Sequence, residues 1–389
     1  MISEIRSQAD QLGDQIRDWR RWFHAHPELT ASEEQTARRV AGILREIGLE
    51  PVERVGGMWG VTADLRVGDR PFVALRADMD ALPVQEETGC EFASRNGGVM
   101  HACGHDAHMA MLLGAAKILA ANRERLIRSV RFIFQPHEEH APGGAPTMIA
   151  AGVLRDVEEI FGLHVWTPLK AGQLGTRVGS LMASGDIFDV TIRGKGGHAA
   201  MPDQCVDPIV AGADFVQALQ TVVSRNVPMH EPAVVSVGQF QAGTTANVIP
   251  ERARIRGTIR TFNPAIRELT RIRVREMAEA VAATHGARAE FKLLPGYPVL
   301  VNHAEATEHL RAAAMAAGLG PEGIVELPPL GVGEDFAYYC EQVPGAFAFL
   351  GAGGGEETSY PHHHPKFAIE ESVLGLGAGV LAGTVGIAN

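Results

Sequence analysis

The 389-residue sequence predicts an α/β protein with a mostly parallel sheet and a smaller, inserted α+β domain. The chain is longer than one compact core usually grows, so two domains are expected. In the first half, apolar strand candidates alternate with helical segments, which is typical of a parallel sheet covered by helices. From about residue 184 the pattern changes to β-α-β-β-α, which is most of a ferredoxin-like fold.

The first half contains one well-marked helix and three buried strand candidates. Ser32 and Gln35 form a capping-box pattern for a helix that Gly48 ends. The strand candidates follow at 72–75, 130–134 and 160–165. Catalytic groups of such sheets collect where strands end and loops begin, so the polar residues after these strands are the candidates for chemistry.

The inserted segment has its own start signals. Asp207 and Pro208 predict the N-cap and first turn of a helix. Strand candidates follow at 233–241 and 252–262, and Asn263-Pro264 starts a second helix. We therefore expect one discontinuous domain from residues 1–182 and 293–389, and an inserted domain from residues 183–292.

Charge and composition argue against two classes of partner. The formal net charge is -11 and no run of lysine and arginine could follow a phosphate backbone, so no nucleic acid is expected. The longest apolar run, 109–121, contains Lys117 and is too short to span a bilayer, and the amino terminus lacks the apolar stretch of a signal peptide. We expect a cytoplasmic protein that does not bind membranes. Its four cysteines are too sparse for a disulfide scaffold, so reduced thiols are expected.

Several residues that can bind a transition metal stand together before a helical apolar run. The segment H-A-C-G-H-D-A-H contains His101, Cys103, His105 and His108. A lone histidine is more often a core or surface residue than a ligand. Three histidines beside a thiol at a loop-to-helix junction favour a metal site.

Two acidic clusters follow predicted strands. Asp78 and Asp80 in R-A-D-M-D-A-L-P could bind metal or orient ligand imidazoles, although a solvated turn explains them equally well. Glu138 and Glu139 in Q-P-H-E-E-H could divide the work, with one bound to a metal and the other acting as a proton shuttle. Adjacent glutamates are usually a charged surface, but their position after an apolar strand weakens that interpretation.

Two further histidine positions complete the candidate set. His164 interrupts an apolar strand, and His362, His363 and His364 form a run near the carboxyl end. A buried histidine can simply hydrogen-bond its neighbours, and a histidine run can be an exposed loop. Together with the thiol and a glutamate, however, these imidazoles supply a mixed soft and hard donor set that suits zinc, manganese, cobalt or nickel.

A series of motifs runs in order along nearly the whole chain. They are H-A-H-P-E-L, R-A-D-M-D-A-L-P, H-A-C-G-H-D-A-H, F-Q-P-H-E-E, G-L-H-V-W, G-K-G-G-H-A-A-M-P, A-N-V-I-P-E, G-E-D-F and H-H-P-K-F. In this order they resemble the aminoacylase family, and more narrowly its hippurate hydrolase and indole-acetyl-amino-acid hydrolase branch. Carboxypeptidase-G-like and dipeptidase-like relatives share the same scaffold.

The resemblance implies a centre of two divalent transition-metal ions, bridged by Cys103 and water. Our interpretation of the split between the ions places Glu139 and His363 on one, and His105 and His164 on the other. The identity of the metal, whether manganese, zinc, cobalt or nickel, does not follow from the residues.

Two further assignments come with the resemblance. His363 is chosen because it stands two residues before Pro365, and His362 and His364 stay open as alternatives. Asp80 matches the family's orienting carboxylate.

In the inserted domain the resemblance implies three substrate contacts, His198, Asn247 and Arg260. It also implies a lid and dimerisation role for this domain, with His198 reaching the active site of a partner subunit. A homodimer or a dimer-based tetramer is therefore expected. Arg260 shares its strand face with Arg254 and Arg256, so a merely charged sheet face is an equal alternative.

The resemblance predicts a metal-dependent amidohydrolase that cleaves small N-acyl-L-amino acids, with Glu138 as the proton shuttle. Three alternatives stay open: a dipeptidase or carboxypeptidase on the same scaffold, a hydrolase with Cys103 as nucleophile, and a protein that binds metal or peptide without turnover. The segments 140–142 and 331–333 depart from the family pattern and could shape the substrate pocket. The acyl group and the amino acid therefore do not follow from the sequence.

Overall fold

The computed structural model describes residues 2–387, and its internal contacts divide the chain into two compact units. The larger unit contains the chain up to Leu181, Val301–Pro328 and the chain from Asp335 onward, and the smaller unit contains Met182–Leu300 and Pro329–Glu334. Residues 1, 388 and 389 of the expected discontinuous domain lie outside the described residues.

The smaller unit extends beyond the expected 183–292 for two reasons. A fourth strand, β13 (Arg288–Pro295), pairs with β8 (Ser184–Arg193) and completes the sheet of this unit. The N–H of Ala183 also donates to the carbonyl of Leu330 at 3.0 Å, which brings a segment from far along the chain into the same unit.

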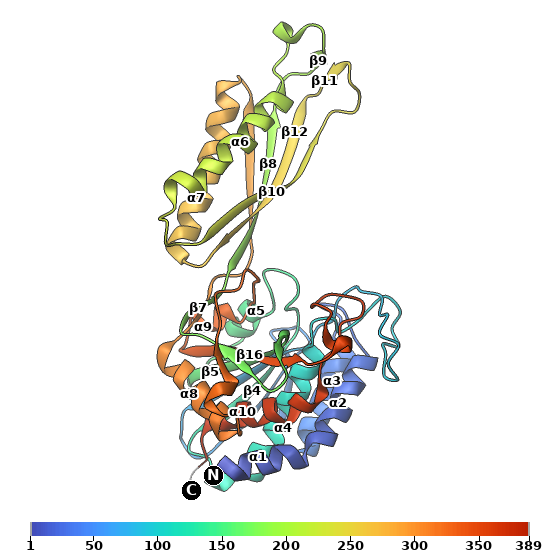
Figure 1. Ribbon diagram of the computed structural model, residues 1–389, viewed down its shortest axis with the longest axis vertical. Helices are drawn as coiled ribbons and strands as arrows, with labels where there is room; N and C mark the ends of the chain where they lie inside the picture. The colour runs from blue at the N-terminus through green and yellow to red at the C-terminus, as the bar shows by residue number, and fades with distance from the viewer. Residues whose placement is uncertain (1, 388–389) are drawn as a thin grey trace. The chain divides into compact units, whose positions relative to one another are not determined.

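The larger unit is built on an eight-stranded sheet (Figure 1). The strand order is β1 (Pro51–Val55), β2 (Gly60–Leu65), β4 (Ser129–Gln135), β3 (Phe72–Asp78), β5 (Val157–Lys170), β16 (Gly345–Gly353), β6 (Leu174–Thr176) and β15 (Ile324–Glu326). The central strands β4, β3, β5 and β16 are parallel, and β1, β2 and β4 pair antiparallel toward one edge. Every residue of β3 and β4 is buried, as expected for strands covered on both faces. The predicted mostly parallel sheet and its three strand candidates are confirmed.

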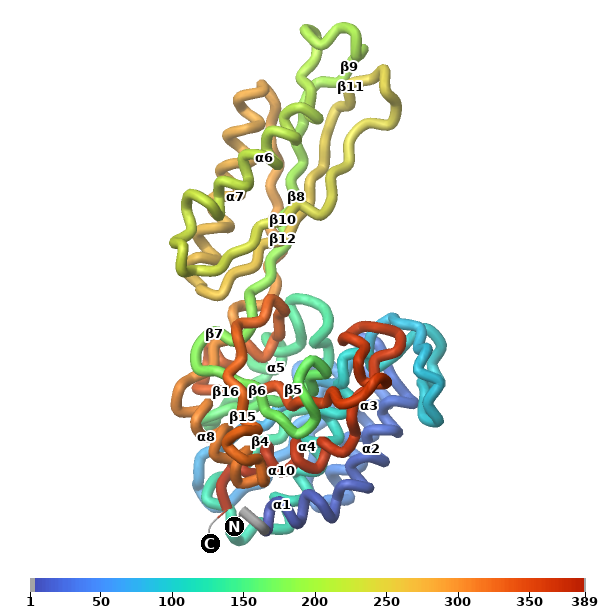
Figure 2. Tube along the Cα trace, viewed as in Figure 1, coloured from blue at the N-terminus to red at the C-terminus, as the bar shows by residue number. Residues whose placement is uncertain are grey.

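The helices of the larger unit pack on this sheet or on one another. They are α1 (Ile2–Gln11), α2 (Gly13–Ala25), α3 (Glu34–Glu46), α4 (His105–Ala121), α5 (Ala145–Ala150), α8 (Ala304–Ala316), α9 (Ala337–Cys340) and α10 (Leu374–Val385). Figure 2 shows that α1 and α2, near the start of the chain, lie beside α10, near its end. Among the helices of the described residues, none combines the length and the apolar character that crossing a membrane requires.

Helix α4 is buried on all sides because it packs against α2, α10 and β3. Gly114 permits this close packing, since a Cβ at this position would lie 2.6 Å from Ile16 in α2 and 2.9 Å from Ala378 in α10. The helix that carries the H-D-A-H end of the histidine motif is therefore held firmly in the core.

The predicted capping box of Ser32 and Gln35 is wrong. The N-cap residue of α3 is Glu33, and no side chain caps the helix from that position. The first-turn N–H of Thr36 is bound instead by Oε2 of Glu28, at 2.8 Å, from the loop before the helix. A local pattern cannot detect a cap from outside the helix, so the true cap was missed.

The smaller unit has the order β8-α6-β10-β12-α7-β13. Besides β8 and β13, its elements are α6 (Pro208–Asn226), β10 (Ala233–Ala242), β12 (Arg252–Thr261), α7 (Pro264–Thr284) and the short strands β9 (Gly197–His198) and β11 (Val248–Ile249). The antiparallel sheet has the order β10-β12-β8-β13, and α6 and α7 cover one of its faces (Figure 1). This arrangement is the ferredoxin-like pattern that the sequence predicts. Two short strands, β7 (Gly179–Met182) and β14 (Leu300–Asn302), lie where the chain passes between the units.

Both predicted N-caps of the smaller unit are confirmed. The side chain of Asp207 accepts the N–H of Ile209 at 2.8 Å, and that of Asn263 accepts the N–H of Ala265 at 2.9 Å. In each case a proline occupies the first helical position.

Candidate metal centre

The five candidate ligands come from separate segments of the larger unit. They are Cys103 before α4, His105 at its first position, Glu139 after β4, His164 within β5 and His363 in the loop after β16. Because β4, β3, β5 and β16 are parallel neighbours, their carboxyl ends meet at one edge of the sheet. The structure therefore brings together side chains that are far apart in the sequence.

Gly104 separates the first two ligand candidates, and the backbone requires a glycine there. Its φ is +94°, and a Cβ would lie 2.3 Å from the side chain of Val165. The C-G-H spacing thus lets the chain turn into α4 directly against β5.

Two groups of donor atoms share the thiol. Cys103, His105 and His164 form one group, and Cys103, Glu139 and His363 form the other, with the donor atoms of each group within 4.8 Å of one another. The Sγ of Cys103 lies 3.5 Å from Nε2 of His164, and Nε2 of His363 lies 3.6 Å from Oε2 of Glu139. Glu138 lies beside these groups, and its carboxylate, with His105 and Glu139, forms a third such cluster.

Buried polar atoms without hydrogen bonds test whether this set fits metal ions. Among the described residues, both ring nitrogens of His105 and Oε1 of Glu139 are buried and make no hydrogen bond. Native interiors rarely leave such atoms unsatisfied unless an ion or water binds them. A thiol, imidazoles and carboxylates that converge in this way are the donor set of a divalent transition metal, so the residues fit such ions.

The electrostatics of the cluster point in the same direction. Burial alone would lower the pKa of His105, but the facing carboxylates of Asp78, Asp80 and Glu139 raise it to about 10. Burial raises the pKa of Glu139 to about 7. The cluster therefore has an excess of negative charge that a cation would balance.

His164 is oriented as a neutral donor. Its Nδ1 donates to the carbonyl of Val165 at 2.7 Å, which leaves the lone pair of Nε2 directed toward Cys103. Burial and the neighbouring His108 and His362 hold the pKa of His164 well below its usual value.

The three consecutive histidines point in different directions. His362 lies with Nε2 3.0 Å from the carbonyl of Val165, and its ring stacks on Trp166. His364 stacks on Tyr360, and its Nδ1 accepts a backbone N–H at 3.0 Å. His363 forms a donor group with Cys103 and Glu139. Its φ of +67° lies in the left-handed region, which residues other than glycine rarely adopt.

Asp80 binds the backbone of the paired glutamates. Its Oδ1 accepts the N–H of Glu138 and its Oδ2 accepts the N–H of Glu139, both at 3.0 Å. The hydroxyl of Thr30 donates to Oδ2 at 2.6 Å, and Nδ1 of His105 lies 3.4 Å from Oδ1. Burial would raise the pKa of Asp80, but His105, Thr30 and the Glu139 N–H hold it below its usual value.

A buried ionic network behind the centre was missed by sequence reasoning. Arg76 binds Oδ2 of Asp78 at 2.7 Å and Oδ1 of Asp335 at 2.6 Å. His108 donates to Oδ1 of Asp78 at 2.6 Å and accepts the N–H of Val165 at 2.9 Å, so both of its ring nitrogens are used. The available signals were the arginine of the R-A-D-M-D motif and the E-D-F motif, but neither reveals its partner.

The three residues expected to contact substrate all lie in the smaller unit, and they fall in two places. His198 pairs with Val248 across β9 and β11, and the N–H of Ala199 donates to the carbonyl of Asn247, so the first two lie together. Arg260 lies near the other end of β12, opposite Gly185 of β8.

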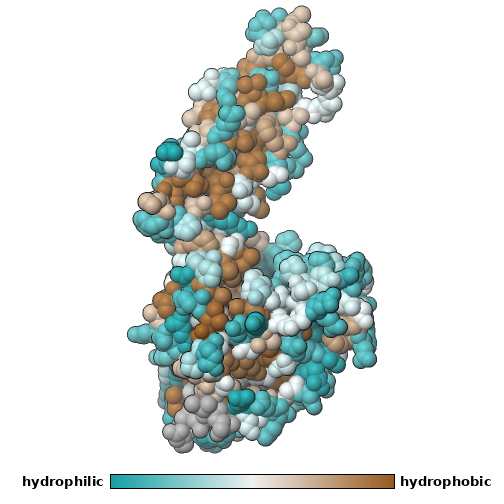
Figure 3. Space-filling model, viewed as in Figure 1, coloured by the Kyte–Doolittle hydropathy of each residue, from teal (hydrophilic) through white to brown (hydrophobic). Residues whose placement is uncertain are grey.

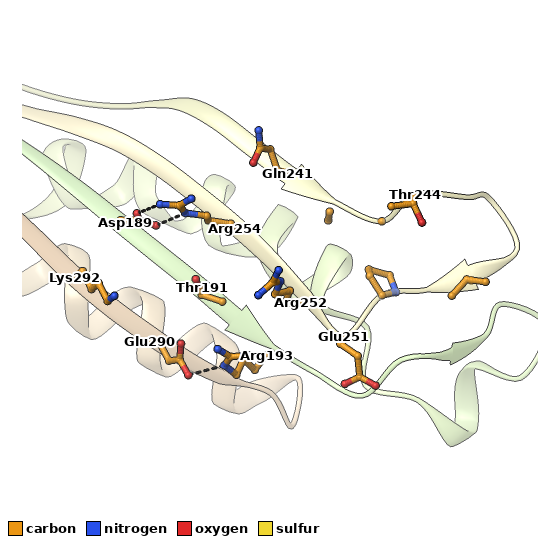
Figure 4. Close-up of a pocket in the computed structure, with 14 residues that line it drawn as sticks. Asp189, Thr191, Arg193, Gln241, Thr244, Glu251, Arg252, Arg254, Glu290 and Lys292 are labelled. Carbon is orange, nitrogen blue, oxygen red and sulfur yellow. Dashed lines mark hydrogen bonds and ion pairs between the residues drawn. The ribbon is translucent and has the colours of Figure 1, made fainter.

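A hollow of about 650 Å³ lies on the sheet face of the smaller unit that the helices leave uncovered (Figure 4). In it, Arg254 binds Asp189 and Arg193 binds Glu290. None of the three expected substrate contacts lines this hollow. Its cations and carboxylates largely neutralise one another, which is the pattern of a charged sheet face.

Comparisons with known proteins place this centre in a family. N-acetylcysteine deacetylase of Bacillus subtilis is 44% identical over 91% of this chain and 92% of its own. Thermostable carboxypeptidase 2 of Saccharolobus solfataricus is 37% identical over 97% of this chain and 96% of its own. A Bacillus subtilis crystal structure described as a dinuclear metal binding peptidase from the M20 family superposes with a TM-score of 0.85 at 38% identity, covering 96% of this chain and 98% of that chain.

Residues 74–386 match the peptidase family M20/M25/M40. The match covers most of the larger unit and the whole of the smaller one. The chain therefore belongs to peptidase family M20/M25/M40 and is a metallohydrolase that acts on amide bonds.

Proposed function

We propose that this protein hydrolyses N-acyl-L-amino acids to a carboxylic acid and a free amino acid. Two divalent transition-metal ions would be held by Cys103, Glu139 and His363 on one side, and by Cys103, His105 and His164 on the other. The observation that carries this proposal is the pair of donor groups sharing one thiol, with the carboxylate of Glu138 beside them.

When bound, two such ions polarise an amide carbonyl and lower the pKa of water at neutral pH. Glu138 takes a proton from the water whose oxygen attacks the amide carbon. As the carbon–nitrogen bond breaks, Glu138 gives this proton to the leaving nitrogen, so the carboxylate is restored. Glu138 is only 6% exposed, which limits competition from bulk solvent for the proton.

His198 is proposed to donate a hydrogen bond to the carbonyl oxygen as negative charge develops there. Its Nδ1 accepts the N–H of Ala200 at 3.0 Å, so in the neutral ring the proton resides on Nε2. The side chain is exposed and can therefore present this N–H to a substrate.

Arg260 is proposed to hold the carboxylate of the amino-acid product by a two-pronged hydrogen bond, with Asn247 as a further contact. Arg254 and Arg256 lie on the same strand face, but both are ion-paired with Asp189. Among the described residues, no carboxylate lies within 4.0 Å of the Arg260 guanidinium. This difference favours a substrate contact over a merely charged face for Arg260.

The smaller unit is proposed to mediate a homodimer in which His198 serves the neighbouring subunit. Apolar residues gather on the surface of this unit (Figure 3), and exposed ones include Val234 and Phe240 on the edge strand β10. An unpaired strand edge with exposed apolar side chains is a ready surface for a second copy.

A hydrolysis screen tests the proposed substrate class. Metal-free protein is supplied separately with manganese, zinc, cobalt or nickel, and N-acetyl and N-benzoyl amino acids are compared with dipeptides. Preferential cleavage of the N-acyl amino acids is expected. Cleavage of peptides alone would favour the second candidate, a carboxypeptidase or dipeptidase, which the Saccharolobus relative supports.

A further inference from the structure

Glu33 is a fully buried acidic residue to which the proposed reaction assigns no role. It lies in the turn before α3, where its Oε1 accepts the N–H of Ala31 at 2.9 Å. The same oxygen accepts the N–H of His137 at 3.0 Å. His137 is the residue directly before Glu138, so this contact joins the turn to the loop of the proposed proton acceptor.

The side chain of Glu33 does not serve to cap α3. Its side chain makes no hydrogen bond to the helix, and the N–H of Thr36 is bound by Glu28 at 2.8 Å. Glu28 also accepts the hydroxyl of Thr36 at 2.9 Å. Glu28 therefore caps the start of the helix, and the carboxylate of Glu33 is left to bind the loop that contains His137.

Three successive N–H groups of this loop are bound by two buried carboxylates. The N–H of His137 goes to Glu33, and those of Glu138 and Glu139 go to Asp80. His137 has a φ of +63°, a left-handed backbone that residues other than glycine rarely adopt. Partners outside the loop therefore help to fix its conformation, together with the N–H of Gly144, which donates to the carbonyl of His137 at 2.7 Å.

A cavity lies beside His137, so close packing there does not substitute for its hydrogen bond to Glu33. This cavity of about 230 Å³ borders Glu33, Pro136 and His137, and Trp59 and Arg54 also line it. The peptide of His137 therefore has space into which it could rotate if the hydrogen bond were lost.

We propose that Glu33 is a positioning residue for Glu138, which it holds in place through the backbone N–H of His137. This inference rests on the proposed role of Glu138 as proton acceptor. Glu33 sets the position of the Pro136–His137 peptide, and Asp80 sets that of the two peptides on either side of Glu138.

The test compares Glu33→Leu with Glu33→Gln, and uses Glu28→Leu as the matched control. Leucine cannot accept a hydrogen bond from the His137 N–H. The proton acceptor Glu138 should then be misplaced, so kcat should fall by about tenfold to a hundredfold. The KM for an N-acyl amino acid and the bound metal per chain should stay at parental values. Glutamine keeps a side-chain oxygen, so Glu33→Gln should stay within about threefold of the parental kcat. Glu28→Leu should lower the urea midpoint but leave kcat per metal-loaded chain unchanged.

Hydrogen exchange of the peptide that contains His137 gives a readout that needs no substrate. Exchange there should accelerate in Glu33→Leu, and stay slow in Glu33→Gln and Glu28→Leu. If Glu33→Leu does not fold, Glu33→Met, which fills similar space without an acceptor, takes its place. A parental kcat in the leucine variant, a loss of activity in proportion to bound metal, or an equal loss in Glu28→Leu would overturn the proposal.

The proposed function and this inference can fail separately. If the metal-loaded parent cleaves no N-acyl amino acid, the substrate proposal fails, and the exchange rates still decide whether Glu33 holds the loop. Unchanged exchange in Glu33→Leu would then overturn the inference on its own.

Discussion

The N–H of Glu138 donates to Oδ1 of Asp80 at 3.0 Å, so the backbone of the proposed proton acceptor is held by a residue 58 positions earlier in the chain. The neighbouring N–H, of Glu139, goes to the other oxygen of the same carboxylate. One carboxylate thus binds the backbone of both glutamates, so the different roles proposed for them rest on their side chains.

Replacing each glutamate with glutamine should separate these roles. Glu139→Gln removes a proposed ligand charge, so bound metal and activity should fall together. Glu138→Gln keeps the ligands but removes the proton acceptor, so metal should stay bound while kcat falls by about a hundredfold or more. Elemental analysis with steady-state kinetics checks both, and calorimetry with an N-acyl amino acid should still detect binding to Glu138→Gln. Near-parental turnover in Glu138→Gln with metals in place would contradict the proposed shuttle.

Metal content should be close to two transition-metal ions per chain, because five donors are too many for one tetrahedral ion that also binds water. A strong chelator should abolish activity, and added metal should restore it. His363→Ala should lose an ion, whereas His364→Ala, the matched control from the same run, should keep both. Full activity in a metal-free preparation would favour Cys103 as a nucleophile instead.

Subunit mixing tests the proposed role of His198. His198→Ala and Glu138→Gln should each be inactive alone as homodimers, since each lacks one part of every site. Hybrid dimers should recover part of the activity, because one of their two sites combines an intact Glu138 with an intact His198 from the neighbour. Labelled subunits confirm exchange by mass spectrometry. No recovery after confirmed exchange would indicate that His198 acts within its own chain or not at all.

Acid should weaken the smaller unit through Asp186, which binds both Arg267 and Arg271 at 2.6–2.9 Å. Burial would raise the pKa of Asp186, but these guanidinium groups outweigh it and hold the pKa below its usual value. The stabilisation is therefore complete above the unfolded-state pKa of about 4 and disappears as the pH falls through the lower folded-state pKa.

Asp186→Asn should lower the free energy of unfolding by about 3 kcal/mol at neutral pH, since it leaves two partly buried cations without their anion. The difference from the parent should shrink below about pH 4. Glu290→Ala, which breaks an exposed ion pair in the same sheet, should lower the free energy of unfolding far less, because water screens both charges. Urea titrations followed by circular dichroism at several pH values check both variants. A difference that is independent of pH would contradict the assignment to Asp186 ionisation.

The sequence predicted the elements whose signals are local. The apolar runs of β3, β4 and β5 are continuous because both faces of these strands are buried, and the Asp207 and Asn263 caps bind N–H groups two residues away. The capping box at Ser32 failed because the partner of Thr36, Glu28, precedes the helix and lies outside the pattern.

The candidate site was predictable in its residue types but not in its geometry. The sequence offered three adjacent histidines, and it is their separate contacts, together with the left-handed backbone at His363, that distinguish His363 from the other two. The support of Glu138 by Asp80 and the approach of Glu33 to His137 join segments that are remote in the chain, so no spacing rule could reveal them.

Strand β16 lies between β5 and β6 although it is synthesised long after both. During synthesis, the edge of β5 that later pairs with β16 therefore stays unpaired while the smaller unit is made. Apart from its short segment 329–334, the smaller unit leaves the ribosome as one stretch that can fold as a unit. Among the proposed ligands, His363 is the last to leave the exit tunnel. A nascent chain that has not yet reached His363 therefore lacks one of the proposed ligands, and the two proposed donor groups can both form only after the smaller unit has been synthesised.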